Sequence, residues 1–423
     1  MKGLPTDVKY YPRMQEVERA AQRISGVSVL TALEGSLTYS NQYQAEVLLK
    51  REDTQLVRSY KIRGAFNKIA SLPAENLESG VVCASAGNHA QGVAFACNRL
   101  GVKGHIYMPV TTPQQKVDQT RMFGGEQVEV VLMGDTFDDS YSEAVRFAHA
   151  HGSSFIHPFD DEKVIEGQAT VALEILSQAD GPIDYLFVPV GGGGLLAGVT
   201  SVFAHYSPHT RIIGVEPQGA ASFSASIKKG RVVQLDHIDR FVDGAAVKKV
   251  GSRNFDICKD KLHDLVGVPE GKVCQTLLDL YNQNAIVAEP AGAMSIAALD
   301  LYEDQIRGKR VVCVLSGGNN DITRMAEIRE RAMLYGGLKH YFVVQFPQRA
   351  GALREFVASV LGPSDDITHF EYSKKHDREN GPAVVGIELQ NPSDLEPLMR
   401  RMKERNFYGR YLNDSRDLFQ YMV

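Results

Sequence analysis

Four consecutive glycines join an apolar run to a helical run in the stretch Val188-Pro189-Val190-Gly191-Gly192-Gly193-Gly194-Leu195-Leu196-Ala197-Gly198. An apolar strand that leads through glycines into a helix is typical of a βα unit in a parallel sheet. Such a turn leaves backbone N–H groups free at the helix N-terminus, where a phosphate binds well. Gly192, Gly194 and Ala197 also match a dinucleotide-binding GxGxxA motif, with Glu216 as the ribose-binding acid. The stretch alone does not decide between a nucleotide and another phosphate-bearing ligand.

Strand-like and helix-like runs alternate on both sides of this turn. Continuous apolar strands flanked by helices are typical of a mostly parallel sheet that is buried on both faces. The sequence therefore predicts an α/β fold for this part of the chain. The expected strands are Gly80–Ser85, Lys103–Met108, Gln127–Leu132, Ser154–His157, Tyr185–Val190, Arg211–Glu216, Ala285–Ala288 and Arg310–Ser316, and the expected helices include Ala90–Leu100, Pro113–Phe123, Thr136–His151, Glu166–Gln178 and Leu195–His205.

The pattern changes near residues 324–338, where a charged helical stretch ends in Tyr335-Gly336-Gly337. Beyond this junction the order of elements is strand, helix, strand, strand, helix, strand, which is the ferredoxin-like arrangement. We therefore expect a catalytic domain over residues 1–332, made of two α/β subdomains with the site between them, and an α+β domain over residues 333–423. The six elements are expected at Lys339–Phe346, Gly351–Leu361, Ile367–Ser373, Ala383–Leu389, Pro392–Asn406 and Tyr408–Leu412, with a hairpin loop at Lys374–Pro382.

The composition is that of an ordinary globular protein with a sizeable core. Of the 423 residues, 43% are hydrophobic and 23% are charged, and the net charge is −5. No cluster of Lys and Arg predicts binding to nucleic acid or to an acidic membrane surface. No apolar run approaches the roughly 20 residues that span a membrane. The five cysteines lack CxxC spacing, so we expect neither disulfides nor a zinc site. These features predict a cytoplasmic protein whose ligands are small molecules.

A lysine lies among small and aromatic residues in the segment Arg58-Ser59-Tyr60-Lys61-Ile62-Arg63-Gly64-Ala65-Phe66-Asn67, just before a predicted helix over Ala65–Ala70. Most lysines of a chain are solvated surface charges. A lysine held partly out of water has a lowered pKa, which favours Schiff-base chemistry. By itself this segment is weak support for such a role.

Two further segments place small polar residues after predicted strands. The first runs Val82-Cys83-Ala84-Ser85-Ala86-Gly87-Asn88-His89 into a helix, so its backbone amides could bind a carboxylate, although Ser and Asn also serve as ordinary helix caps. The second, Val312-Cys313-Val314-Leu315-Ser316-Gly317-Gly318-Asn319, offers a hydroxyl where ligands of parallel sheets gather. A nicotinamide-binding interpretation gives no role to Lys61 or Ser316. A pyridoxal 5'-phosphate (PLP) interpretation uses all four segments.

In combination the four segments resemble the threonine/serine dehydratase group of fold-type II PLP enzymes, which share the fold of the tryptophan synthase β chain. The resemblance covers about residues 13–332. It implies that Lys61 forms the Schiff base, that Tyr60 packs near the cofactor ring, and that Asn88 contacts the ring hydroxyl oxygen. It further implies that Gly191, Gly192, Gly193, Gly194 and Leu195 bind the phosphate, that Ser316 faces the pyridine nitrogen, and that Ser85, Ala86, Gly87, Asn88 and His89 bind the substrate. Glu289-Pro290-Ala291-Gly292 is similar to another segment near the family's active site.

The sequence differs from some relatives at two places, the residue that donates a proton to the substrate and a divalent-cation site. Ala86 stands where serine racemases of the group place a proton-donating serine, so racemisation is not expected. A divalent-cation site of some relatives is only partly matched, because Glu216 and Ala220 fit but Ser222 replaces an aspartate. We therefore assign no metal ligands.

The C-terminal part, from Lys339 onward, resembles the single ACT-like regulatory domain of biosynthetic threonine dehydratases. The resemblance implies a carbon–nitrogen lyase that converts L-threonine, and also L-serine, to the 2-oxo acid and ammonia as the first committed step of isoleucine biosynthesis. It implies isoleucine or valine as the effector, and a homo-oligomer, either a tetramer or a dimer. The alternatives are a serine-preferring or catabolic dehydratase, a PLP-dependent β-replacement enzyme, an NAD-dependent oxidoreductase, and an amino-acid sensor with a decayed site.

Overall fold

The computed structural model describes residues 10–372 and 380–414, and its chain divides into two compact units. The first contains Met1–Glu270 and Asp279–Asp321, and the second contains Gly271–Leu278 and Ile322–Val423. Most of the predicted loop Lys374–Pro382 lies outside the described residues. The predicted boundary between residues 332 and 333 stays a prediction.

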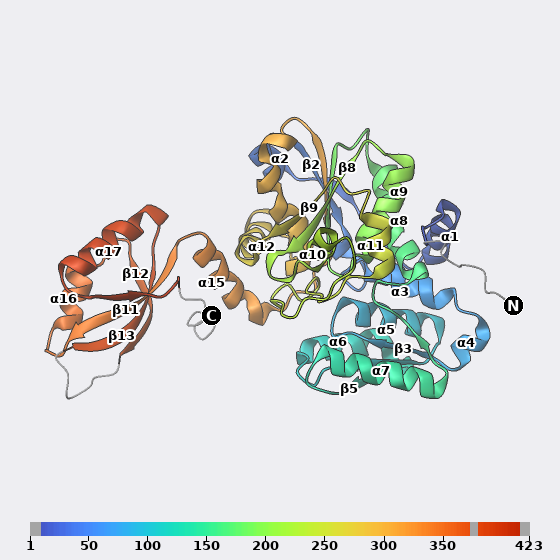
Figure 1. Cartoon of the computed structure of the whole chain (residues 1–423), viewed down its shortest axis with the longest axis horizontal. Coiled ribbons are helices and arrows are strands. Elements are labelled where there is room, and N and C mark those ends of the chain that lie inside the picture. The colour runs from blue at the N-terminus through green and yellow to red at the C-terminus, as the bar shows by residue number, and fades with distance from the viewer. Residues whose placement is uncertain (1–9, 373–379, 415–423) are drawn as a thin grey trace. The chain divides into compact units, whose positions relative to one another are not determined.

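The larger sheet of the first unit has six strands in the order β1-β2-β10-β7-β8-β9, and only the β1–β2 pair is antiparallel. Along β10 the side chains alternate, so that Val312 and Val314 pack against α8 and α9 while Cys313 reaches Ser295 of α13 on the other face. The strands are β1 Leu33–Gly35, β2 Glu46–Arg51, β7 Tyr185–Pro189, β8 Arg211–Pro217, β9 Asp264–Val268 and β10 Arg310–Leu315. The other helices of this part of the first unit are α1 Met14–Ile24, α2 Leu37–Tyr43, α8 Glu162–Gln178, α9 Gly194–Tyr206, α10 Ser222–Lys229, α11 Ser252–Cys258, α13 Pro290–Ala297 and α14 Glu303–Ile306 (Figure 1). The helix α12 Glu270–Asn284 is divided between the two units.

The smaller sheet has four parallel strands in the order β5-β4-β3-β6. Val81 and Cys83 pack with α3 and α5, whereas Val82 and Ala84 pack with α7, so both faces are buried. The strands are β3 Val81–Ala84, β4 Gly104–Met108, β5 Val128–Leu132 and β6 Ser154–Phe155. The helices are α3 Lys61–Ala70, α4 Ala74–Glu78, α5 Asn88–Leu100, α6 Gln114–Gly124 and α7 Phe137–His151.

Glycines let α3 and α9 pack closely against α8. A Cβ at Gly167 would lie 2.6 Å from the Gly64 Cα, and a Cβ at Gly198 would lie 2.7 Å from the backbone nitrogen of Ala169. Real side chains do not tolerate such contacts with backbone. The helix α8 therefore fixes the positions of α3, which begins at Lys61, and of α9, which follows the glycine run.

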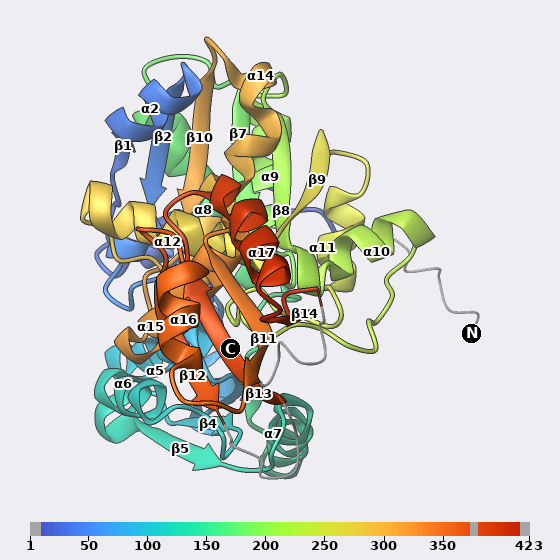
Figure 2. The ribbon, with the colours of Figure 1, turned by 90° about the vertical axis from the view of Figure 1, so that its left-hand side faces the viewer.

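The second unit contains the predicted ferredoxin-like sheet, with the antiparallel order β12-β13-β11-β14. Phe342 and Val344 of β11 share one apolar cluster with Phe356 of α16 and Met402 of α17, so both helices cover the same face of the sheet (Figure 2). The elements are α15 Met325–Tyr335, β11 Lys339–Pro347, α16 Ala352–Ser359, β12 Asp366–Tyr372, β13 Asn380–Glu388, α17 Leu395–Glu404 and β14 Tyr408–Tyr411.

One predicted strand is wrong. Residues Ala285–Ala288 form no strand, because Ala285 ends α12 in the left-handed conformation (φ 52°) and Glu289 caps α13. Ile286 and Val287 favour a strand locally, but the preceding left-handed residue turns the chain away from one. Three strands of the larger sheet, β1, β2 and β9, were not expected from the sequence.

Candidate active site at the carboxyl end of β10

Backbone hydrogen bonds bring the lysine segment and the serine segment together. Tyr60 N donates to the Ser316 carbonyl oxygen (3.2 Å), and Gly318 N donates to that of Arg58 (2.9 Å). Ser59 and Gly317 form an antiparallel bridge between these two bonds. Because α3 begins at Lys61 and Ser316 directly follows β10, the start of this helix lies at the carboxyl end of the strand. This is the edge of a parallel sheet where ligands bind.

The Lys61 amine is held away from bulk water. Its Nζ donates to the Pro158 carbonyl oxygen (3.0 Å) and lies 5.3 Å from the centre of the Tyr60 ring. Burial lowers the pKa of Lys61 to about 8, although the Glu289 carboxylate opposes the shift. More of this amine is therefore neutral near neutral pH than of an exposed lysine, and the neutral amine is the form that Schiff-base formation requires.

The glycine run forms a tight turn before α9. A Cβ at Gly192 would lie 2.3 Å from the Phe159 ring, and Gly193 has a positive φ of 89°. The Asn254 side chain donates to the carbonyl oxygens of Gly192 (2.8 Å) and Phe159 (3.1 Å) and so holds the turn. With the carbonyl of Gly192 held, and no side chain capping α9, the amides of the turn remain available to an anion. These residues fit the phosphate of PLP.

We predict that Gly193→Ala weakens PLP binding about 10- to 100-fold. A side chain at this positive φ is strained, and its Cβ would lie 2.8 Å from the Phe223 ring, a combined cost of about 1–3 kcal/mol. The measurement is a PLP titration of the apoenzyme. Gly101→Ala is the matched control, because Gly101 also has a positive φ (67°) but its Cβ would meet no atom within 4 Å. Equal affinities of the two variants would contradict this assignment of the turn.

The Ser85–Asn88 turn leaves room for a ligand. No side chain caps α5, and a Cβ at Gly87 would meet no atom within 4 Å. The His89 ring is instead buried, with its Nε2 2.9 Å from the Ile156 carbonyl oxygen. Burial first, and then the nearby Lys61 charge, lower the pKa of His89 to about 3. His89 is therefore neutral, and only its backbone can serve the predicted substrate loop.

Ser316 is buried (3% exposed) at the end of β10, where the pairing with residues 58–60 holds its backbone. We predict that Ser316→Ala lowers kcat about 10- to 100-fold while the fold stays intact, since a hydrogen bond lost in a buried site costs about 1–3 kcal/mol. Steady-state kinetics together with circular dichroism test this. Kinetics equal to those of the parent protein would remove Ser316 from the site.

Sequence reasoning assigned no role to three side chains that lie beside the predicted ones. Asn88 Nδ2 donates to Glu289 Oε1 (2.6 Å), and Asn319 Nδ2 donates to Asn88 Oδ1 (2.7 Å). Asn254, which holds the glycine turn, is the third. Glu289 and Asn319 lie within the segments Glu289–Gly292 and Val312–Asn319, so the sequence pointed to both residues without indicating what they do. No pattern around Asn254 indicated its role.

Glu216 has a structural role at the N-terminus of α10. Its buried carboxylate accepts hydrogen bonds from Phe223 N (2.6 Å), Ser224 N (2.8 Å) and the Ser224 hydroxyl (2.7 Å). The dinucleotide interpretation would need this acid to face a ribose. In the part of the chain that the structure describes, no three His, Cys, Asp or Glu side chains come together to hold a metal ion. Every helix within residues 10–372 and 380–414 is too short or too polar to cross a bilayer.

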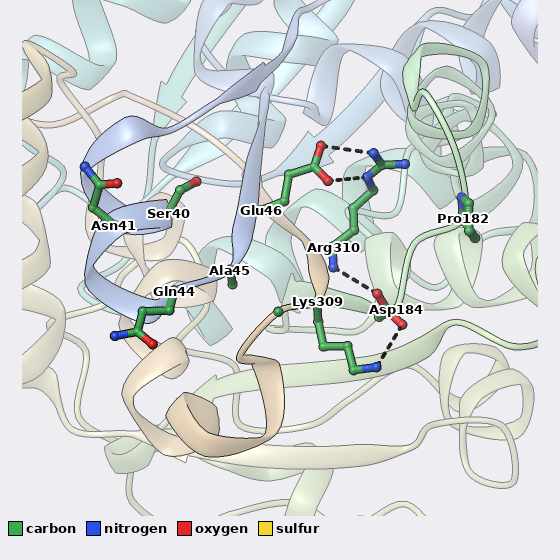
Figure 3. Close-up of a pocket in the computed structure, with 10 residues that line it drawn as sticks. Ser40, Asn41, Gln44, Ala45, Glu46, Pro182, Asp184, Lys309 and Arg310 are labelled. Atoms are coloured by element: carbon green, nitrogen blue, oxygen red, sulfur yellow. Dashed lines mark hydrogen bonds and ion pairs between the residues drawn. The ribbon is translucent and has the colours of Figure 1, made fainter.

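A pocket of about 590 Å³ lies at the opposite edge of the larger sheet (Figure 3). Its charged side chains are already paired: Arg310 Nε donates to Glu46 Oε2 (2.8 Å), and Lys309 lies 3.8 Å from Asp184. None of the predicted site residues lines it. It is lined by Ser40, Asn41, Gln44, Ala45, Glu46, Pro182, Asp184, Gly308, Lys309 and Arg310.

Comparison with known proteins supports the PLP interpretation. The family described as pyridoxal-phosphate dependent enzyme matches residues 26–317, and that described as the C-terminal regulatory domain of threonine dehydratase matches residues 330–422. A biosynthetic L-threonine dehydratase of Halalkalibacterium halodurans is 56% identical over 97% of this chain and 99% of its own length. One of Bacillus subtilis is 54% identical over 97% of each chain.

A solved structure agrees with these relatives. The processed form of threonine deaminase isoform 2 from Solanum lycopersicum is 38% identical and superposes with a TM-score of 0.71, covering 78% of this chain and 99% of the other. The predicted fold class and cofactor are thus confirmed. The chain belongs to the PLP-dependent enzymes and, within them, to the biosynthetic L-threonine dehydratases with one C-terminal regulatory domain.

Proposed function

We propose that this protein converts L-threonine to 2-oxobutanoate and ammonia, as the first committed step of isoleucine biosynthesis. The observation that carries the proposal is the pairing of residues 58–60 with residues 316–318, which brings a lysine of lowered pKa to the end of β10. The relatives named biosynthetic L-threonine dehydratase match nearly the whole chain, including its regulatory part.

Lys61, the substrate loop and the glycine turn have separate roles in this reaction. Bound PLP supplies an electron sink for the pair of electrons that the α-carbon of the substrate gains on losing its proton. Once the substrate amine had taken its place, the Lys61 amine would remove that proton as general base. The amides of Ala86–His89 would hold the substrate carboxylate, which fixes the direction of the Cα–H bond. The Ser85 amide of the predicted substrate loop does not take part, because it already donates to the Tyr107 carbonyl oxygen (3.1 Å). The amides of Gly191–Gly194 hold the phosphate.

Ser316 favours elimination over transamination. A carboxylate facing the pyridine nitrogen would hold a proton there, whereas a neutral hydroxyl does not. The electrons from the α-carbon would then be withdrawn less strongly and would form the Cα–Cβ double bond as the Cβ–O bond breaks. The departing hydroxide and the α-proton that Lys61 removed together make up the one water that is lost. Hydrolysis of the released enamine gives the 2-oxo acid and ammonia.

The reaction is tested by comparing 2-oxobutanoate formation from L-threonine with pyruvate formation from L-serine. The proposal predicts a larger kcat/KM for threonine. A larger value for serine would favour the serine-preferring alternative, and the absence of both products would contradict a dehydratase.

The second unit is proposed to bind a branched-chain amino acid. Its match to a threonine dehydratase regulatory domain supports a small-molecule effector, and we infer isoleucine as inhibitor, with valine as a second ligand. Isoleucine titration of the initial rate should give a saturable decrease. No effect of isoleucine at millimolar concentration would contradict the inference. A homo-oligomer and a cytoplasmic location remain predictions, the latter supported by five buried cysteines that are not in disulfides.

A further inference from the structure

Asn88 lies between a carboxyl group and a second amide. Its Nδ2 donates to Glu289 Oε1 (2.6 Å), and its Oδ1 accepts from Asn319 Nδ2 (2.7 Å). Asn319 Nδ2 also lies within hydrogen-bond distance of the Val57 carbonyl oxygen (2.8 Å) and of Gln91 Oε1 (2.9 Å). The three bonded side chains come from the first turn of α5, from the N-cap of α13 and from the loop after β10.

These partners allow only one orientation of the Asn88 amide. Above the raised pKa of Glu289 its ionised carboxylate only accepts hydrogen bonds, so it selects the NH₂ end of the amide. The backbone carbonyl oxygen of Val57 fixes the NH₂ group of Asn319, and this donor selects the carbonyl end of Asn88. The Asn88 NH₂ group has two hydrogens, and one remains for a ligand. Rotating the amide by 180° would place the Asn88 NH₂ group against the NH₂ group of Asn319 and the Asn88 carbonyl oxygen against the Glu289 carboxylate.

The packing around Glu289 allows little movement of its carboxyl group. The side chain is 4% exposed, and a Cβ at Gly317 would lie 2.3 Å from its Oε1. Glu289 N donates to the Gly317 carbonyl oxygen (3.1 Å), which ties the residue to the segment after Ser316. A glycine at position 317 is therefore required for the carboxyl group to reach Asn88.

The charges that face Glu289 come from several elements. Asp243 of the loop before α11 forms an ion pair with Lys116 of α6, and Lys61 begins α3. Burial first, and then Asp243, raise the pKa of Glu289 to about 7, while Asn88, Lys116 and Lys61 act in the opposite direction. In return the Glu289 charge raises the pKa of Lys61 and so opposes the effect of burial. The backbone places the two groups near each other: Glu289 N donates to the Gly317 carbonyl oxygen (3.1 Å), and Gly317 bridges Ser59, two residues before Lys61.

We propose that Glu289 is a positioning residue with two effects, orienting the Asn88 amide toward the cofactor ring and acting as counter-charge to Lys61. The proposal rests on the proposed function, because it assigns Asn88 and Lys61 to the cofactor. Glu289 itself need not touch substrate or cofactor. Its influence passes through one hydrogen bond and through charge.

The test uses the full-length apoenzyme with Glu289→Gln and Glu289→Leu, and with Glu166→Gln as a matched control. Glu166 is also a buried glutamate with a raised pKa, but its partners are Tyr10 and Lys163. The first readout is PLP affinity. Glu289→Leu should weaken it about 10-fold or more because Asn88 loses its orienting acceptor, whereas Glu289→Gln, which keeps an acceptor oxygen, should weaken it less.

The second readout is the rate of Schiff-base formation with PLP as a function of pH. Glu289→Gln removes the charge that raises the pKa of Lys61, so the midpoint should move to lower pH than in the parent protein. Glu166→Gln should leave affinity and midpoint unchanged. An unchanged midpoint in Glu289→Gln would overturn the proposal. This variant gives the deciding result even if Glu289→Leu does not fold. If the parent protein itself forms no Schiff base with PLP, the proposed function fails instead.

Discussion

Lys61→Ala should lower kcat for threonine by at least about 10⁴-fold. A general base contributes about 10²–10⁴-fold, and this lysine is also the proposed covalent holder of the cofactor. Lys61 donates to the carbonyl oxygen of Pro158, and the next residue, Phe159, packs against the glycine turn. The amine and the predicted phosphate site therefore lie in one region. The substitution removes the amine without adding bulk, so the fold should survive.

Initial rates of 2-oxobutanoate formation measure this effect, and circular dichroism verifies the fold. Lys68→Ala is a suitable control, since Lys68 lies on the same helix but pairs with Asp161 (2.7 Å). Lys68→Ala should retain most of the activity. Turnover by Lys61→Ala within 100-fold of the parent protein would show that another group removes the proton.

Arg63→Met should destabilise the protein by about 3–5 kcal/mol, because it removes the partner of the fully buried Glu52 carboxylate and one partner of the partly buried Glu174 carboxylate. Arg63 is fully buried two residues beyond Lys61, and it bonds Glu52 through Nε and Nη2 (2.8 Å each) and Glu174 through Nη1 (2.6 Å). Lys50, also fully buried, donates to the second Glu174 oxygen (2.6 Å). The two cations balance the two carboxylates, so the loss of Arg63 leaves a net buried charge.

The effect is measured as a shift of the urea midpoint, followed by circular dichroism because the chain contains no tryptophan. Burial raises the pKa of Glu52, but Arg63 and Lys50 lower it more, so the pKa lies below its usual value. Native Glu52 thus stabilises the parent protein near neutral pH, and this contribution is lost as the pH falls through the lowered pKa. In Arg63→Met the same pKa should rise, so the deficit should be smaller at pH 5 than at pH 8. A pH-independent deficit would contradict this explanation.

Local patterns were sufficient to predict the parallel sheets, the glycine turn and the ferredoxin-like order. Apolar runs such as Tyr185–Pro189 and Arg310–Leu315 form strands close to their predicted bounds. The strand β2, which lies between β1 and β10, was missed because it carries Lys50, a charged residue of a type that is usually exposed. Its burial depends on Glu174, which lies 124 residues away and has no local signal.

Some residues of the site could likewise be predicted from local sequence patterns, whereas others are evident only from the tertiary structure. Lys61, Ser316 and the glycine run stand in motifs, because their chemistry needs particular residue types at fixed spacing. The orientation of Asn88 depends on Glu289 and Asn319, which lie 201 and 231 residues away in the sequence. Asn254 belongs to no motif, and only the fold shows that its amide holds the glycine turn. Such partnerships arise from tertiary structure and not from local pattern.

Lys61 is expected to bind the aldehyde of PLP covalently. Borohydride reduction of the PLP-loaded protein, followed by trypsin digestion and mass spectrometry, shows which lysine carries the cofactor. Because trypsin cleaves after Arg58 and Arg63, we expect one pyridoxyl-phosphate group on the peptide Ser59–Arg63, with Lys61 protected from cleavage. A label on any other lysine, or a protein that takes up no PLP before reduction, would contradict it.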